Sequence, residues 1–262
     1  MLEKIAEYPS RYIGLFRPTK PKAKILQNLL QSHEIRFGDA FEKAIEEYLE
    51  LKGCEILPKK FTTANNDTLN IDQCFRYKQK VYFIEQKVRD DHDSTKKRGQ
   101  IQNFEKKLDL MLTMFAEQEL VGIFYFIDPD LVKNKNFYVA ELDKMTKDYN
   151  VETQIFYGQP LFDYLGLTDV WDEILQYLEL WKKEIPDFPE INFDTDAQHT
   201  FEEIKDLKPL IFRKLFDNEI IFEEIVLTLF PDKKTLRLLL NYFESKETTI
   251  YKTLAEKLRE KI

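Results

Sequence analysis

Two acidic residues and a lysine of this chain are placed where they could hydrolyse a phosphate ester. Asp72 lies in one predicted strand, and Glu85 and Lys87 lie in the next, within the run VYFIEQKV. Side chains two residues apart on a strand point to the same face, so Glu85 and Lys87 project together, and hairpin pairing can bring Asp72 beside them. Two neighbouring carboxylates repel each other, and a divalent cation, which prefers oxygen ligands, relieves that repulsion. A bound cation acidifies water and neutralises phosphate charge, while the lysine can orient or help deprotonate the water or stabilise developing charge.

The Glu-x-Lys spacing carries little information by itself, because the chain is rich in both residues. It occurs five times, beginning at Glu50, Glu85, Glu105, Glu203 and Glu244. Four of these copies fall in predicted helices, where residues two apart do not face each other. The copy at Glu85 lies in an apolar strand, where a charged pair costs free energy and is therefore expected to have a function. The alternative interpretation is a strand end that carries an exposed Glu–Lys pair.

Other catalytic classes lack their characteristic residues. The three histidines, at 33, 92 and 199, form no H-E-x-x-H motif, and there is no G-x-S-x-G, Walker or G-x-G-x-x-G motif. We therefore expect neither a zinc hydrolase nor a requirement for ATP. Cys54 and Cys74 make no disulfide framework, which favours a reducing compartment, the cytoplasm. No apolar run is long enough to cross a membrane, and the N-terminus lacks the apolar core of a secretory signal.

The alternation of elements predicts an α/β fold, with a central mixed β-sheet flanked by helices and a C-terminal helical lobe. Strands are predicted over residues 54–61, 69–77, 81–88, 121–127, 137–142 and 151–157, with turns at 65–67 and 78–80. Helices are predicted over residues 35–49, 101–115 and 160–165, and almost throughout after residue 168 apart from breaks at 186–189 and at Pro231. The run VGIFYFI at 121–127 is apolar on both faces, which is typical of a strand in the middle of a sheet.

The same pattern divides the chain into three predicted parts. Residues 1–30 form a basic, irregular arm, residues 31–168 the core, and residues 169–262 a helical lobe for dimerisation or support. The net charge of −8 argues against binding to nucleic acid, but residues 11–24 hold five basic residues and no acidic one. Residues 76–107 hold ten basic and five acidic residues. These two segments are either DNA-binding surfaces or ordinary solvated faces.

With these residues and this element order, the chain resembles the PD-(D/E)XK nuclease superfamily, and within it the type II restriction endonucleases. Asp72, Glu85 and Lys87 match the superfamily motif, although Ile71 stands where the motif has a proline. The resemblance implies that the two acids hold Mg²⁺ and that the lysine assists the attacking water. It covers roughly residues 35–167, and the segment IFYGQPLFDYLG resembles the last strand and helix of several restriction enzymes.

Many members of this superfamily carry a further glutamate on the helix before the core, where it helps to bind metal or phosphate. In the phrase RFGDAFEKAIEEYL, Glu42 is the candidate for this role. The alternative is that Glu42 is a solvent-facing helix residue.

The polar segment RDDHDSTKKRGQIQNF follows the Glu-x-Lys strand and is rich in groups that read bases or hold phosphates. The residues predicted to contact DNA are Arg89, Asp91, His92, Asp93, Ser94, Thr95, Lys96, Lys97, Arg98, Gln100 and Asn103. One alternative is a solvated loop in which Ser94 or Thr95 caps the next helix. Another is a second metal site formed by Asp90, Asp91, His92 and Asp93.

The resulting prediction is a Mg²⁺-dependent endodeoxyribonuclease that cuts double-stranded DNA at a short, palindromic site to restrict foreign DNA. A palindromic site implies a two-fold homodimer. The resemblance also implies a cognate DNA methyltransferase in the same system, although not as a binding partner. Two alternatives stay open: a structure-directed nuclease, such as a junction resolvase, with the same metal site, and a non-catalytic DNA-binding protein on the nuclease fold.

Overall fold

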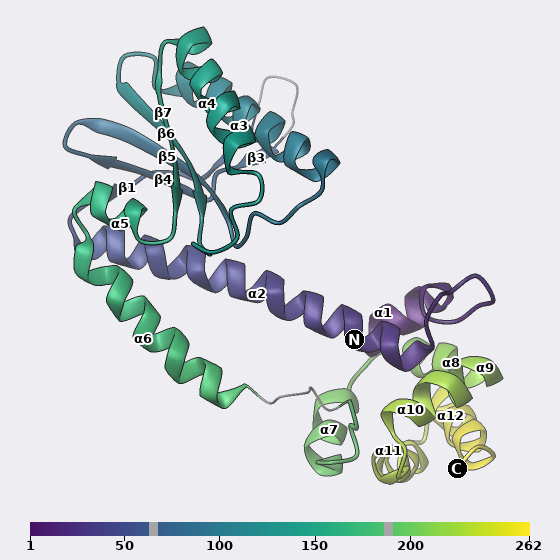
Figure 1. The fold of residues 1–262 in the computed structure, drawn as a ribbon. Helices are drawn as coiled ribbons and strands as arrows, with labels where there is room; N and C mark the ends of the chain where they lie inside the picture. Colours follow the sequence, from purple (N-terminus) through teal and green to yellow (C-terminus); the bar gives the residue numbers. More distant parts are fainter. Residues whose placement is uncertain (63–67, 186–190) are drawn as a thin grey trace. The chain divides into compact units, whose positions relative to one another are not determined.

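The computed structural model describes residues 1–62, 68–185 and 191–262 and divides into two compact units (Figure 1). One unit is Glu34–Ile185, and the other combines Met1–His33 with Pro186–Ile262. The turn predicted at 65–67 and the break predicted at 186–189 lie outside the described residues.

The Glu34–Ile185 unit is built on a mixed five-stranded sheet in the order β1-β4-β5-β6-β7. The strands are β1 (Glu55–Ile56), β4 (Gln73–Tyr77), β5 (Lys80–Lys87), β6 (Glu119–Phe126) and β7 (Glu152–Tyr157). β4 pairs antiparallel with β1 and β5, whereas β6 pairs parallel with β5 and β7. β2 (Lys60–Thr62) and β3 (Thr68–Asn70) form a separate antiparallel pair. The predicted mixed sheet is confirmed, and the doubly apolar β6 lies inside it.

The hairpin between β4 and β5 fixes the register on which the site depends. Only Lys78 and Gln79 separate the strands, and both adopt left-handed backbone conformations, with φ of 47° and 68°. A two-residue turn of this kind matches the right-handed twist of the strands. The predicted strand at 69–77 is divided into β3 and β4, and Asp72 lies in the short gap between them.

Helices cover both faces of the sheet (Figure 1). α2 (Pro21–Leu51), α5 (Pro160–Leu165) and α6 (Thr168–Glu184) pack on one face, and α3 (Ser94–Met114) and α4 (Lys135–Tyr149) on the other. Alternation along β5 explains this arrangement, because Tyr82 and Ile84 enter the first core and Val81 and Phe83 the second. The result is a three-layer α/β structure, as the sequence predicts.

The other unit is helical and has its own apolar core. Its elements are α1 (Leu2–Glu7), a 3₁₀ turn η1 (Pro9–Arg11), residues 21–33 of α2, α7 (Ala197–Ile204), α8 (Pro209–Asp217), α9 (Glu219–Ile221), a π-helical turn η2 (Phe222–Val226), α10 (Leu227–Leu229), α11 (Lys234–Glu244) and α12 (Thr249–Arg259). Leu2 and Ile5 of α1 are buried in this core together with Phe212 of α8. The N-terminal residues therefore belong to the same compact unit as the C-terminal helices.

Two local expectations from the sequence are wrong. Residues 1–30 are not an irregular arm, because α1 and η1 cover residues 2–11 and α2 begins at Pro21. Residues 137–142 are helical rather than extended, because Tyr138, Leu142 and Met145 bury a helical stripe of α4. The compact units also divide the chain near residues 33 and 185 rather than at 30 and 168.

Candidate active site

The carboxylates of Asp72 and Glu85 converge at one end of the β4–β5 hairpin. The register pairs Gln73 with Ile84, so Asp72, one residue before β4, lies opposite Glu85. The backbone N–H of Gln86 donates to Asp72 Oδ2 at 2.7 Å and fixes this side chain. Glu85 is only 2% exposed, so its charge depends on partners inside the protein.

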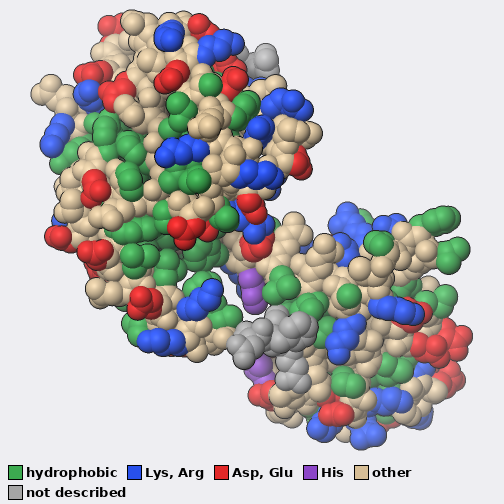
Figure 2. All heavy atoms as spheres, in the orientation of Figure 1, with side chains coloured by type: hydrophobic (Ala, Val, Ile, Leu, Met, Phe, Trp, Pro, Cys, Tyr) green, Lys and Arg blue, Asp and Glu red, His purple; other side chains and the backbone are tan. Residues whose placement is uncertain are grey.

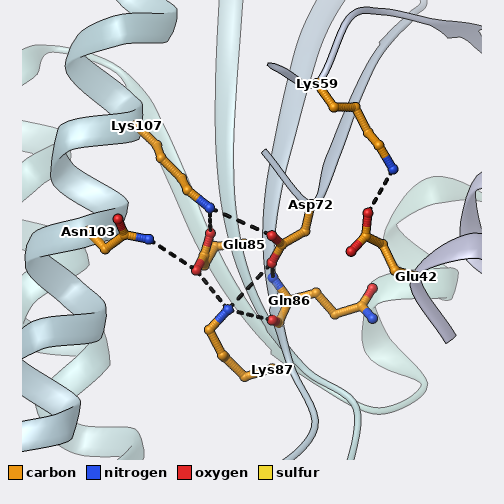
Figure 3. Close-up of polar contacts among 8 residues, drawn as sticks. All are labelled: Glu42, Lys59, Asp72, Glu85, Gln86, Lys87, Asn103 and Lys107. Atoms are coloured by element: carbon orange, nitrogen blue, oxygen red, sulfur yellow. Dashed lines mark hydrogen bonds and ion pairs between the residues drawn. The ribbon is translucent and has the colours of Figure 1, made fainter. Parts of the chain in front are cut away.

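Two lysines supply those partners, and each contacts both carboxylates (Figure 3). Lys87 Nζ lies 2.7 Å from Glu85 Oε1 and 3.4 Å from Asp72 Oδ2. Lys107, on α3, contacts Glu85 Oε2 and lies 3.6 Å from Asp72 Oδ1. The four side chains thus form a closed ring of alternating charge, here called the charge ring.

The charge ring determines the protonation of Lys87. Burial alone lowers the pKa of this lysine, but the charges of Glu85 and Asp72 outweigh burial and raise the pKa above its usual value. Lys87 is therefore an ammonium at neutral pH while it keeps these two partners.

A cavity of about 200 Å³ opens beside the charge ring. Its lining residues are Gly38, Asp39, Glu42, Asp72, Gln86, Lys87 and Val88. Glu42 of α2 accepts a hydrogen bond of 2.7 Å from Lys59 Nζ. Burial raises the pKa of Glu42, and Lys59 offsets part of that shift. The structure therefore places Glu42 at the same cavity as Asp72 and Lys87, engaged with a lysine.

The oxygen atoms around the Lys87 ammonium, beside this cavity, fit a hard divalent cation. Asp72 Oδ2, Glu85 Oε1 and the carbonyl oxygen of Gln86 all lie within 3.4 Å of Lys87 Nζ, the carbonyl at 2.7 Å. Three oxygens from two strand segments thus already converge on one cationic atom, and oxygen ligands are those that Mg²⁺ prefers. Within the described residues, no cluster of three or more His, Cys, Asp or Glu side chains is suited to a metal. Two carboxylates and a carbonyl would leave coordination positions for water and phosphate.

The segment after β5 leads into the N-terminus of α3. Asp93 is the N-cap, and its carboxylate accepts from the backbone N–H groups of Thr95 and Lys96, both at 2.9 Å. These bonds hold the pKa of Asp93 below its usual value. The cap is therefore Asp93 rather than Ser94 or Thr95, which are exposed.

Most of the residues predicted to contact DNA surround this helix end. Those that are exposed are Arg89, Asp91, Asp93, Ser94, Thr95, Lys96 and Arg98. Figure 2 shows Lys and Arg side chains on the surface at the N-terminal end of α3. Arg89 pairs with Asp91 at 3.3 Å, and burial lowers the pKa of His92, so that its imidazole is neutral at neutral pH.

Asp90 anchors this segment to the sheet. Its fully buried carboxylate accepts from Asn134 N–H and Nδ2, both at 2.8 Å, and from the Tyr157 hydroxyl at 2.9 Å. Asn134 also accepts a hydrogen bond of 3.1 Å from Lys97. Asp90 is thus occupied by three donors, which argues against a second metal site at residues 90–93.

Two residues predicted to contact DNA face other protein groups. Asn103 Nδ2 lies 3.5 Å from Glu85 Oε1, and Gln100 accepts a hydrogen bond of 2.6 Å from the Tyr138 hydroxyl. Lys107, the fourth member of the charge ring, is not among the site residues predicted from the sequence, and it does not line the cavity. A signal was present, because Lys107 stands three residues after Phe104 on the buried face of α3.

A family model described as "Type II restriction endonuclease, HinfI" matches residues 1–62 and 50–182, which together are more than half of the chain. The chain belongs to the HinfI family of type II restriction endonucleases. No curated protein and no solved structure matches the chain. The family match begins before and ends after the resemblance inferred from residues 35–167 alone.

Family membership makes this protein a site-specific deoxyribonuclease that acts on double-stranded DNA. Type II restriction endonucleases generally depend on a divalent metal, in agreement with the oxygen groups beside the charge ring. In the part of the chain that the structure describes, no helix is long and apolar enough to cross a membrane.

Proposed function

We propose that this HinfI-family enzyme cuts duplex DNA at a short palindromic sequence in a Mg²⁺-dependent reaction at a site of the PD-(D/E)XK type. The observation that supports the proposal most directly is the convergence of Asp72, Glu85 and Lys87 beside an open cavity. The chemistry of these groups suits phosphodiester hydrolysis, and the family supplies the substrate class.

Each group of the site has a distinct part in this proposal. Asp72, Glu85 and the Gln86 carbonyl would hold Mg²⁺, which when bound lowers the pKa of a coordinated water and neutralises phosphate charge. Lys87 is the more exposed lysine of the charge ring, at 27%. From that position it binds the scissile phosphate or orients the attacking water. Glu42 lines the cavity, is paired with Lys59, and would help to bind metal or phosphate.

DNA contact is proposed for the start of α3. Lys96 and Arg98 are exposed there, and their positive charges attract phosphates. The neutral imidazole of His92 and the side chain of Arg89 can instead read base edges. Phosphate contacts position the protein, and base contacts provide specificity.

A palindromic target calls for a two-fold homodimer. Within residues 169–262, α6 exposes Tyr177 at 61% and Leu180 at 57%, which offers apolar surface to a second copy. In a restriction system, a cognate methyltransferase would protect the host's own sites. Sedimentation velocity over a range of concentrations tests the dimer, and a constant monomer would contradict it.

Digestion of unmethylated phage DNA tests the function, with Mg²⁺, with Ca²⁺ and with EDTA in parallel. We expect discrete fragments with Mg²⁺ alone, whose ends map the target. A smear would instead favour a structure-directed or non-specific nuclease. Intact DNA in every lane, with binding confirmed in Ca²⁺, would favour a non-catalytic DNA-binding protein.

Two variants assign the activity to this site. Lys87→Met should abolish cleavage and keep DNA binding in Ca²⁺, because it removes an ammonium that lines the cavity. Lys246→Met is the matched control, because Lys246 belongs to another Glu-x-Lys copy, begun by Glu244 at the end of α11. Equal loss of activity in both variants would show that cleavage does not depend specifically on the Glu-x-Lys motif at Glu85, and would contradict the assignment.

A further inference from the structure

Lys107 is a buried cation that the proposed reaction does not use. It is 4% exposed on the face of α3 that packs on the sheet, between the core residues Phe104 and Leu108. Its ammonium contacts Glu85 Oε2 and lies 3.6 Å from Asp72 Oδ1. A lysine is rarely buried so completely unless it is paired, and here both partners are the proposed metal ligands.

The two lysines of the charge ring differ in how freely their ammonium groups can move away from Asp72 and Glu85. Lys87 lines the cavity and is 27% exposed, so it can turn toward solvent or substrate. Lys107 does not line the cavity, and its side chain is enclosed by the core between α3 and the sheet. Any cation that enters from the cavity therefore displaces Lys87 and leaves Lys107 in place.

We propose that Lys107 is a fixed counter-charge that keeps Asp72 and Glu85 from binding a divalent cation tightly until DNA brings a phosphate to the site. This inference rests on the proposed function, because it takes the two acids as metal ligands. Lys107 is a positioning residue in this scheme, since it acts through Asp72 and Glu85 rather than on the substrate.

The net charge of the site explains why binding of the cation would depend on bound DNA. With Lys87 turned away, two carboxylates and Lys107 leave a net charge of −1 to hold a divalent cation. The phosphate of bound DNA supplies one further negative charge on the cavity side. Removal of the Lys107 charge would make the site more negative by the same amount at all times. Asp72 and Glu85 would then bind the cation tightly without DNA.

Calorimetric titration of DNA-free protein with Ca²⁺ tests the proposal. Lys107→Met keeps the length of the side chain and removes its charge, and Lys106→Met is the matched control on the exposed face of α3. We expect Ca²⁺ binding to tighten about tenfold to a hundredfold in Lys107→Met, by the Coulomb energy of one charge a few ångströms away. The Lys106→Met and Lys107→Arg variants should keep the wild-type affinity, because the buried charge is retained in both.

Thermal unfolding gives a second readout that is independent of activity. In EDTA, Lys107→Met should melt well below Lys106→Met, because two buried carboxylates have lost one counter-charge. Millimolar Ca²⁺ should remove most of this difference in melting temperature. Unchanged Ca²⁺ affinity in Lys107→Met would overturn the proposal, and so would a variant that stays unfolded in Ca²⁺. Wild-type protein that neither binds Ca²⁺ with DNA nor cleaves in Mg²⁺ would instead overturn the proposed function.

Discussion

The hydroxyl of Tyr157 stabilises the start of the proposed DNA-contacting segment, and Tyr157→Phe measures that contribution. The hydroxyl donates at 2.9 Å to Asp90, whose carboxylate is fully buried. A hydrogen bond to a charged group contributes about 1.5–3 kcal/mol, and loss of one of the three donors leaves the buried charge less well satisfied. The ring itself stays, stacked on Phe126 with centroids 4.9 Å apart, so the substitution creates no large cavity. We therefore expect the free energy of unfolding to fall by about 2 kcal/mol.

Equilibrium unfolding in urea at neutral pH measures this loss, and Tyr164→Phe is the matched control. The Tyr164 hydroxyl also donates at 2.9 Å to a carboxylate, that of Glu152, but Tyr164 is 40% exposed. Water replaces a lost partner at an exposed site, so the control should lose less than about 1 kcal/mol. Hydrogen exchange should also become faster at the Asn134 amide, which donates to Asp90, in Tyr157→Phe alone.

Equal losses in the two variants would refute the reasoning, because they would show that the burial of Asp90 adds nothing to the bond. A double variant, Tyr157→Phe with Asp90→Asn, measures the interaction energy between these two side chains apart from their other contacts. Its loss should be smaller than the sum of the two single losses, since both substitutions weaken the same interaction.

Three further predictions concern other residues of the Glu34–Ile185 unit. Asp72→Ala should lower the cleavage rate by about a hundredfold to a thousandfold, because it removes a charge at the proposed site. DNA binding in Ca²⁺, measured by gel shift, should be kept, and an unchanged cleavage rate would contradict the prediction. Gly122→Ala should cost about 1–3 kcal/mol in urea unfolding, because its Cβ would lie 2.8 Å from the Phe83 ring, whereas Gly99→Ala, with open space, should cost nothing. Burial raises the pKa of the Cys74 thiol to about 12, so alkylation should stay slow from pH 7 to pH 9 and become fast only in denaturant.

The proposed site could be predicted because its decisive residues are local in sequence. Glu85 and Lys87 share one strand, and the strands that bring Asp72 beside them are joined by a two-residue turn. Their arrangement therefore depends on alternation and on one hairpin register, both of which can be read from a short stretch of chain. The mixed sheet could be predicted for a similar reason, because β6 is apolar on both faces.

The spacing from Phe104 places Lys107 on the buried face of α3, but its partners could not be predicted from the sequence because the contact is tertiary. Twenty-two residues separate it from Glu85, and the contact exists only because α3 returns across the sheet face. The sequence shows a lysine on a helix rich in lysine, where a solvated face is the ordinary interpretation. α1 was missed for the same reason, since a six-residue helix has little stability of its own and is held by the core around Phe212.

The charge ring also explains how the proposed nuclease site can be assembled inside a packed sheet. Glu85 is almost inaccessible to water, and an ionised carboxylate there would be strongly destabilising without a cation. The chain supplies two cations of its own, so the fold does not depend on a metal for its stability. One of these, Lys87, lines the cavity proposed to receive the phosphate, and the other, Lys107, is enclosed in the core. In the proposed reaction, the enclosed lysine would therefore stabilise the buried carboxylates while the more exposed lysine acts on the substrate.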